Sequence, residues 1–295
     1  MSDVGSEDGG IPLIEELSAS PEPQTSGKRK RQDESKTESK RAAKRKRSKK
    51  PKDIEDEALD TEVGVNHAIA HMDSQLLADH IAQRTKRLQK DLSLVELEDL
   101  HIPVSAIVDS TEFGKQRTME HLPAYLEKYV GKVTSKNKKN RLQDAPKEKG
   151  TPHTLVIAGA GLRAADLTRS LRQLQTKESK VAKLFAKHIK LKEAIEEVKK
   201  TRMNIGVGTP QRVIDLLDDG KSRTNESVLV ANQRTGALSS AALERIVIDA
   251  SHIDQKKRGI LDMKETQAPL VQLLARKEFQ DRYSATEGRI QLLFF

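Results

Sequence analysis

Short apolar runs alternate with amphipathic stretches along the second half of the chain. The runs cover residues 154–159, 203–208, 243–248 and 290–295, and each is bounded by glycine, proline or polar residues. Runs this short and this uniformly apolar are typical of strands buried on both faces, and the helical stretches between them predict right-handed crossovers. The pattern therefore predicts an α/β fold built on a mainly parallel sheet.

Residues 176–201 fit two interpretations. Val181, Leu184, His188, Leu191 and Ile195 follow a continuous helical face, which would make the segment one long helix. A strand near 181–187 followed by a helix fits the same residues, and periodicity alone leaves both open.

The first half of the folded part is helical by the same criterion. Apolar residues recur at helical spacing over 66–90 and again over 119–129. Ser93 followed by Glu96 forms a capping box that predicts another helix start, and Pro103 ends that helix. Residues 131–150 form a loop with seven basic and two acidic residues.

The first 60 residues have almost no aliphatic periodicity. Ordering their backbone would cost about 1–2 kcal/mol per residue with little burial to offset it, so we expect a disordered tail. Residues 28–52 hold 14 basic and three acidic residues. Two dense basic clusters within this segment resemble nuclear import signals; they comprise Lys28, Arg29, Lys30, Arg31, Lys44, Arg45, Lys46 and Arg47.

Composition removes several classes of protein. The 295 residues include no Cys, no Trp and eight aromatic residues, which excludes disulfide scaffolds, Cys-ligated zinc modules and thiol catalysis. No window reaches the roughly 18 apolar residues of a membrane span, so we expect a soluble intracellular protein with no membrane partner. His67 and His71 lie four apart, but no carboxylate stands between them and no third ligand is evident, so we expect no metal site.

Positive charge is not confined to the tail. The chain carries a net charge of +9, and residues 61–295 alone hold 39 basic and 30 acidic residues. A folded part with this excess of cations is typical of proteins that bind phosphate backbones.

The ends of the predicted strands carry the candidate motifs, because parallel sheets bind ligands at the carboxyl ends of their strands. Gly159-Ala160-Gly161 lacks the third glycine of a dinucleotide loop. Thr209-Pro210-Gln211-Arg212 resembles the TPGR segment of DEAD-box RNA helicases, and Arg163 stands where that family has the arginine of its PTRELA segment. Asp249-Ala250-Ser251-His252 occupies the place of the DEAD motif. The resemblance covers about 105–295 and implies a RecA-like domain.

Departures from the helicase pattern predict that the chain is not an enzyme. In Asp109–Gln116, the nearest candidate for a phosphate-binding loop, only Gly114 and Lys115 match, and Gln116 replaces the hydroxyl that would hold magnesium. Ala250 replaces the glutamate that would activate water. The chain also ends at Phe295, before a second RecA-like domain, so we expect no catalytic residues, no cofactor and no small-molecule substrate.

The combination closely resembles the Cms family of nucleolar small-subunit ribosome biogenesis proteins, which are degenerate relatives of DEAD-box proteins with a single RecA-like domain. Asn66–Asp73, Leu76–His80 and Ile107–Phe113 look like that family's own segments. The resemblance implies a disordered tail (1–60), a helical extension (61–101) and one three-layer RecA-like domain (102–295). It also favours a strand at 181–187.

The resemblance implies a non-catalytic nucleolar factor that binds pre-rRNA or ribonucleoprotein, together with small-subunit assembly factors, during assembly of the 90S pre-ribosome and rRNA processing. A protein-interaction scaffold for a helicase or assembly factor and a residual nucleotide-binding protein are the alternatives. The candidate RNA-binding residues come from two sources. The DEAD-box resemblance supplies Arg163, Thr209 and Arg212, and positive charge suggests Lys115, Lys132, Lys136, Lys138 and Lys139.

Overall fold

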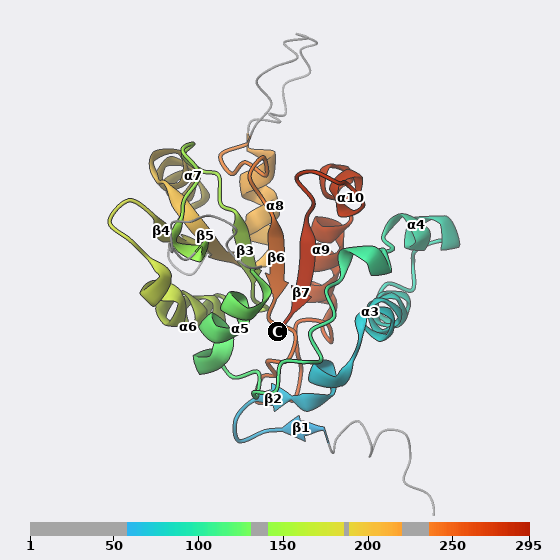
Figure 1. Ribbon diagram of the computed structural model, residues 1–295. Helices are drawn as coiled ribbons and strands as arrows, with labels where there is room; N and C mark the ends of the chain where they lie inside the picture. The colour runs from blue at the N-terminus through green and yellow to red at the C-terminus, as the bar shows by residue number, and fades with distance from the viewer. Residues whose placement is uncertain (1–57, 131–140, 186–188, 220–235) are drawn as a thin grey trace, which may run out of the picture. The chain divides into compact units, whose positions relative to one another are not determined.

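A five-stranded parallel sheet forms the centre of the protein (Figure 1). We describe residues 58–130, 141–185, 189–219 and 236–295 of a computed structural model. The strands run in the spatial order β4-β5-β3-β6-β7, and every neighbouring pair is parallel. Their bounds are Thr154–Ile157 (β3), Lys180–Leu184 (β4), Met203–Gly208 (β5), Arg245–Ile248 (β6) and Gln291–Phe294 (β7).

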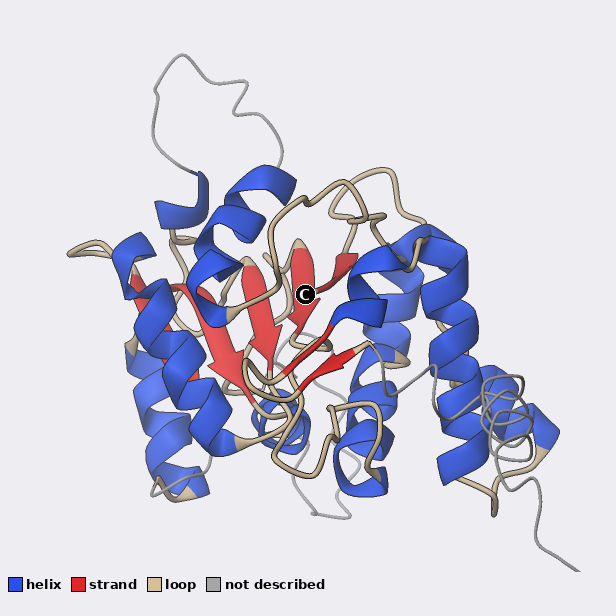
Figure 2. Ribbon diagram, turned by 90° about the horizontal axis from the view of Figure 1, so that it is seen from below, coloured by secondary structure: helices blue, strands red, loops and turns tan. Residues whose placement is uncertain are grey.

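Helices cover both faces of this sheet, as Figures 1 and 2 show. One face is covered by α5 (Leu122–Tyr129) and α6 (Gly161–Leu171). The other face is covered by a larger set of helices, which comprises α3 (Ser74–Leu88), α7 (Leu191–Lys200), α8 (Pro210–Asp218), α9 (Lys264–Leu274) and α10 (Lys277–Tyr283). The three-layer α/β architecture with a mainly parallel sheet is therefore confirmed.

Alternate residues of the central strand supply the two cores. Leu155 and Ile157 of β3 pack in the core beneath α8 and α9, whereas Val156 and Ala158 pack in the core beneath α5 and α6. All four are at most 1% exposed. A strand that alternates between two apolar layers must be apolar at every position, which is the origin of the uninterrupted runs in the sequence.

Residues 176–201 form a strand followed by a helix. β4 pairs with β5, and α7 begins after it at Leu191. The strand-then-helix interpretation favoured by the family resemblance is therefore confirmed. Helix α10 is absent from the sequence prediction, although Phe279 and Tyr283, four residues apart, are fully buried in it.

The helical segment ahead of the sheet is more divided than expected. The sequence predicts one helix over 66–90, whereas a 3₁₀ turn covers His67–His71 and α3 starts separately at Ser74. The Asp73 carboxylate accepts a hydrogen bond from the Leu76 amide and so caps the new helix, which explains the break. The predicted capping box of Ser93 and Glu96 is confirmed at the start of α4 (Leu94–Asp99).

A short hairpin precedes these helices. Strands β1 (Leu59–Asp60) and β2 (Val65–Asn66) pair antiparallel, and Val65 also bridges to His252 beyond the end of β6. On β7, the strand next to β6, Ile107 bridges to Leu292 in parallel. Across the ranges described, no helix is long and apolar enough to cross a bilayer.

The closest backbone approach in the sheet provides a test of its packing. A Cβ at Gly208 would lie 2.3 Å from the Leu184 carbonyl oxygen and 2.9 Å from Val213, so Gly208→Ala forces β4 or α8 to shift. We expect the free energy of unfolding to fall by about 1–3 kcal/mol, measured by urea denaturation. Gly114→Ala is the matched control, because nothing lies within 4 Å of its new Cβ. Equal losses in the two variants would contradict this account of the sheet.

Candidate nucleic-acid interface

The carboxyl ends of β3 and β6 are joined by an ion pair. Arg163, in the first turn of α6, donates from Nε to Asp249 Oδ2 at 2.8 Å and from Nη2 to Asp249 Oδ1 at 3.1 Å. The Asp249 side chain is 2% exposed and that of Arg163 is 15% exposed. Both carboxylate oxygens thus accept hydrogen bonds from one guanidinium, the strongest arrangement available to such a pair.

The β1–β2 hairpin is bound to the segment that follows Asp249. The Asn66 amide donates to the Ser251 carbonyl at 2.6 Å, and the Ile253 amide donates to the Gly64 carbonyl at 3.0 Å. A cavity of about 290 Å³ lies beside the hairpin and is lined by Val63, Gly64, Val65, Thr118, Met119, Glu120 and Arg163. The β1–β2 hairpin therefore lies against the end of β6, and the cavity beside the hairpin is small.

His252 lies next to this ion pair. Burial lowers the pKa of His252, and the positive charge of Arg163 lowers it further. Both effects favour the neutral form of the His252 imidazole beside the Arg163–Asp249 ion pair.

Residues 109–116, which resemble a degenerate phosphate-binding loop, fold around an internal contact. The Thr111 amide and hydroxyl both donate to Asp109 Oδ1, at 2.9 and 2.7 Å, and these hydrogen bonds lower the pKa of Asp109. Phe113 is buried and meets the ring of Tyr125 edge to face at 5.0 Å. Lys115 is exposed. The loop thus directs an aromatic ring into the core and leaves its one lysine in solvent.

Arg117 anchors the end of this loop and is a residue that the sequence interpretation missed. Its side chain is 1% exposed and lies over the Tyr125 ring, with 5.6 Å between the guanidinium carbon and the ring centroid. It donates to the Phe294 carbonyl, to the Ser110 carbonyl at 3.1 Å and to the Ser110 hydroxyl at 3.0 Å. Nothing in the local sequence distinguishes Arg117 from a surface cation.

Thr209 and Arg212 lie at the end of β5, the strand next to β3. Thr209 occupies the N-cap position of α8, but its side chain makes no capping hydrogen bond. Arg212 is half-buried and donates from Nη2 to the Ile189 carbonyl at 3.3 Å, while its Nη1 is buried without a partner among the described residues. The fold therefore places Arg163, Thr209 and Arg212 on neighbouring strand ends, and their role toward RNA stays a prediction.

The other candidate residues lie outside the described ranges. They are Lys132, Lys136, Lys138 and Lys139 of the basic loop, and the import residues Lys28, Arg29, Lys30, Arg31, Lys44, Arg45, Lys46 and Arg47.

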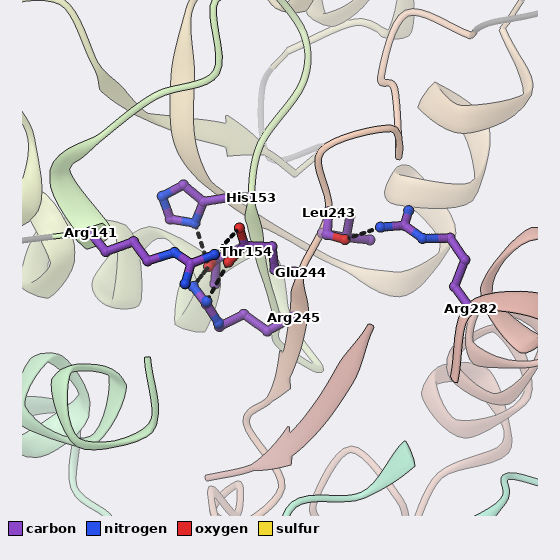
Figure 3. Close-up of polar contacts among 7 residues, drawn as sticks. All are labelled: Arg141, His153, Thr154, Leu243, Glu244, Arg245 and Arg282. Atoms are coloured by element: carbon purple, nitrogen blue, oxygen red, sulfur yellow. Dashed lines mark hydrogen bonds and ion pairs between the residues drawn. The ribbon is translucent and has the colours of Figure 1, made fainter. Parts of the chain in front are cut away.

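A second charged cluster lies at the opposite, amino-terminal ends of β3 and β6 (Figure 3). Glu244 accepts from Arg141 at 2.6 Å and from Arg245, while Arg245 also donates to the Thr154 hydroxyl at 3.2 Å. His153 contacts the same hydroxyl at 2.7 Å. Arg245 is 3% exposed, so Glu244 and Thr154 supply partners for the terminal nitrogens of a cation that the sheet has buried.

Comparison with known proteins places the sequence in a defined group. Residues 24–295 match the family model described as CMS1, U3-containing 90S pre-ribosomal complex subunit. Protein CMS1 of Chaetomium thermophilum is 50% identical over 268 residues, which cover 91% of this chain and 96% of the relative. Protein cms1 of Schizosaccharomyces pombe is 31% identical over 72% of this chain and 68% of its own length. Human Protein CMSS1 is 30% identical over 61% of this chain and 55% of its own length.

The Arg163–Asp249 pair generates a stability prediction. Arg163→Ala would leave a buried carboxylate unpaired, and we expect it to lower the free energy of unfolding by about 2–4 kcal/mol. Asp249→Ala should cost a similar amount, whereas the double variant should cost clearly less than the sum of the two. Urea denaturation of the four proteins completes the cycle. Additive losses would show that the two side chains do not stabilise each other.

The His153 environment predicts a pH dependence. Burial lowers the pKa of His153 to about 4, with a further contribution from Arg245. Between about pH 4 and pH 6.5 the unfolded chain binds a proton there that the folded chain does not, so stability rises with pH across this window. The effect is up to roughly 3 kcal/mol. We expect His153→Gln to flatten the profile of unfolding free energy between pH 4.5 and pH 7, and an unchanged profile would contradict the assignment.

Proposed function

Because the chain belongs to the CMS1 family of U3-containing 90S pre-ribosomal complex subunits, we propose that it is a non-catalytic, RNA- or ribonucleoprotein-binding subunit of that complex. It would act in small-subunit assembly and rRNA processing, and would do so in the nucleus and nucleolus. Its partners would be pre-rRNA and the assembly factors that surround it.

The observation that carries the non-catalytic part is the Arg163–Asp249 pair. A metal-bound nucleotide would need the Asp249 carboxylate free to accept the metal or its water ligands. Both oxygens of this carboxylate already accept from Arg163, and Ala250 offers no second carboxylate. Phe113 packs in the core within the loop that would have to wrap the phosphates. These contacts favour a domain that uses its fold for binding.

Charge supports the RNA-binding part. Residues 61–295 carry an excess of nine cations, and Lys115 is an exposed cation near the sheet's carboxyl end. The chain has only eight aromatic residues, and Phe113 and Tyr125 are buried, so base stacking has few platforms. These features favour contacts to the sugar-phosphate backbone, which are largely independent of RNA sequence.

One surface favours a scaffold role in addition. A cavity of about 610 Å³ between α3 and α4 is lined by apolar residues including Ile81, Leu97 and Ile102. On α4, Leu94 is 77% exposed and Val95 is 69% exposed. Exposed apolar side chains beside an apolar cavity are typical of protein-interaction surfaces.

The RNA-binding proposal is tested by salt titration of the full chain. A labelled single-stranded RNA should bind with an affinity that falls linearly in logarithmic salt, with a slope of about −0.7 for each phosphate neutralised. A tail-neutral variant, in which every Lys and Arg of residues 28–52 is replaced by Gln, isolates the contribution of the folded part. We expect this variant to retain a salt-dependent affinity. Loss of all measurable binding in the tail-neutral variant would leave the folded part without the proposed role.

A further inference from the structure

A hollow in the described part of the protein lies at the free edge of the sheet, away from the strand ends that carry Arg163, Thr209 and Arg212. It has a volume of about 850 Å³ and lies along β4, between α6 on one side and α7 on the other. Strand β4 is the last strand in the sheet order, and no described strand pairs with its outer side. We call this hollow the edge groove; it is lined by Thr168, Arg172, Gln175, Thr176, Lys177, Lys180, Val181, Ala182, Lys183, Glu197 and Thr201.

Four cations and one carboxylate line the edge groove. Lys180 and Lys183 are exposed and project from β4 itself, about 10 Å apart along the strand and, because their spacing is odd, toward opposite faces of the sheet. Arg172 and Lys177 precede the strand and are also exposed. The positive charge therefore surrounds the edge of the sheet from both sides.

These four cations differ from the arginines elsewhere in the domain. Arg163, Arg258 and Arg276 each hold an ion pair with an aspartate. Among the described residues, none of the four groove cations has an ion pair or a side-chain hydrogen bond. The groove thus concentrates cations that no carboxylate of the described residues pairs with.

The uncharged residues that line the edge groove suit a polyanion, such as a nucleic acid, that binds through its own backbone. Gln175 and Thr176 are exposed and can donate hydrogen bonds to phosphate oxygens, as Gln and Thr commonly do at nucleic-acid interfaces. No aromatic side chain lines the groove, so bases would find no stacking surface. For an added peptide strand, the floor offers only Val181, which is buried, and the small Ala182, and edge lysines commonly oppose strand addition.

From this arrangement we propose that the edge groove binds the phosphate backbone of single-stranded RNA, as a surface separate from the strand ends that carry Arg163, Thr209 and Arg212. The inference rests on the proposed RNA-binding function and assigns it a second site. Recognition there is electrostatic and independent of base identity. The edge groove lies along the outer side of β4, whereas the other surface lies at the carboxyl ends of β3 and β5. A single RNA that contacts both would run from the edge groove to the carboxyl end of the sheet.

The test is charge reversal in the tail-neutral variant of the full chain, with fluorescein-labelled oligo(U) as the probe. Lys180→Glu with Lys183→Glu should weaken binding at least about tenfold at low salt and reduce the salt slope by about 1.4. Lys90→Glu with Lys277→Glu makes the same change in net charge at two exposed lysines outside the groove, and should leave both quantities nearly unchanged. Circular dichroism and the urea midpoint establish that both variants fold.

The outcomes separate the inference from the function on which it rests. If the groove and control variants weaken binding equally, net charge alone is responsible and the edge groove is not a site. A triple variant, Arg163→Ala with Asp249→Ala and Arg212→Ala, removes the cations at the strand ends. If this triple variant loses affinity while the groove variant binds like its parent, the proposed function stands and the groove inference is overturned. If the parent binds no oligo(U), both fail.

A peptide probe distinguishes the other class of partner. A labelled peptide of alternating Glu and Val has the charge and the backbone to add to β4 as a strand. If it binds the parent but not the groove variant, and oligo(U) does not displace it, the groove belongs to an acidic protein segment and the RNA inference is overturned. Displacement by oligo(U) supports the inference.

Discussion

Burial of the parallel sheet on both faces is the constraint on which the rest of the structure depends. Leu155, Val156 and Ile157 of β3 each contribute to one of two apolar cores, and the neighbouring strands pack so closely that Gly208 leaves no space for a Cβ. Burying a polar side chain on the face of such a sheet is costly unless the side chain finds a hydrogen-bond partner. Charged groups are therefore confined to the strand ends and to the outer edge of β4.

The two ends of the sheet neutralise their charges in similar ways. At the carboxyl end, Asp249 is paired with Arg163, and Arg117 is enclosed by carbonyl oxygens and the Tyr125 ring. At the amino end, Arg245 donates hydrogen bonds from its terminal nitrogens to Glu244 and Thr154. Because these groups are buried, their interactions are stronger than in water and their loss is correspondingly costly. The edge of β4 is different, because its cations are exposed and no carboxylate in the described part of the chain pairs with them.

On the proposed function, this division would let a parallel α/β domain serve as a binding module. Asp249 contributes to internal stability through its ion pair with Arg163, and Phe113 contributes through the apolar core. Binding energy would then come from exposed cations around the domain, and such contacts tolerate many RNA sequences. A subunit of a large RNA-containing complex can use such contacts because neighbouring subunits can supply specificity.

The sequence by itself determined the fold class, most of the elements and the family. Uninterrupted apolar runs identify strands that are covered on both faces. The capping box at Ser93 marks a helix start through local hydrogen bonds, and Pro210, directly after Thr209, marks another because its backbone angle is fixed. Periodicity could not separate strand from helix over 176–201, because both patterns place apolar residues at compatible positions. Only the tertiary structure decided that Arg163 faces Asp249, that Arg117 is buried, and that Lys180 and Lys183 belong to a free sheet edge. The order of strands in space sets these contacts, and the pairing of β3 with β6 brings together Arg163 and Asp249, which are 86 positions apart in the sequence.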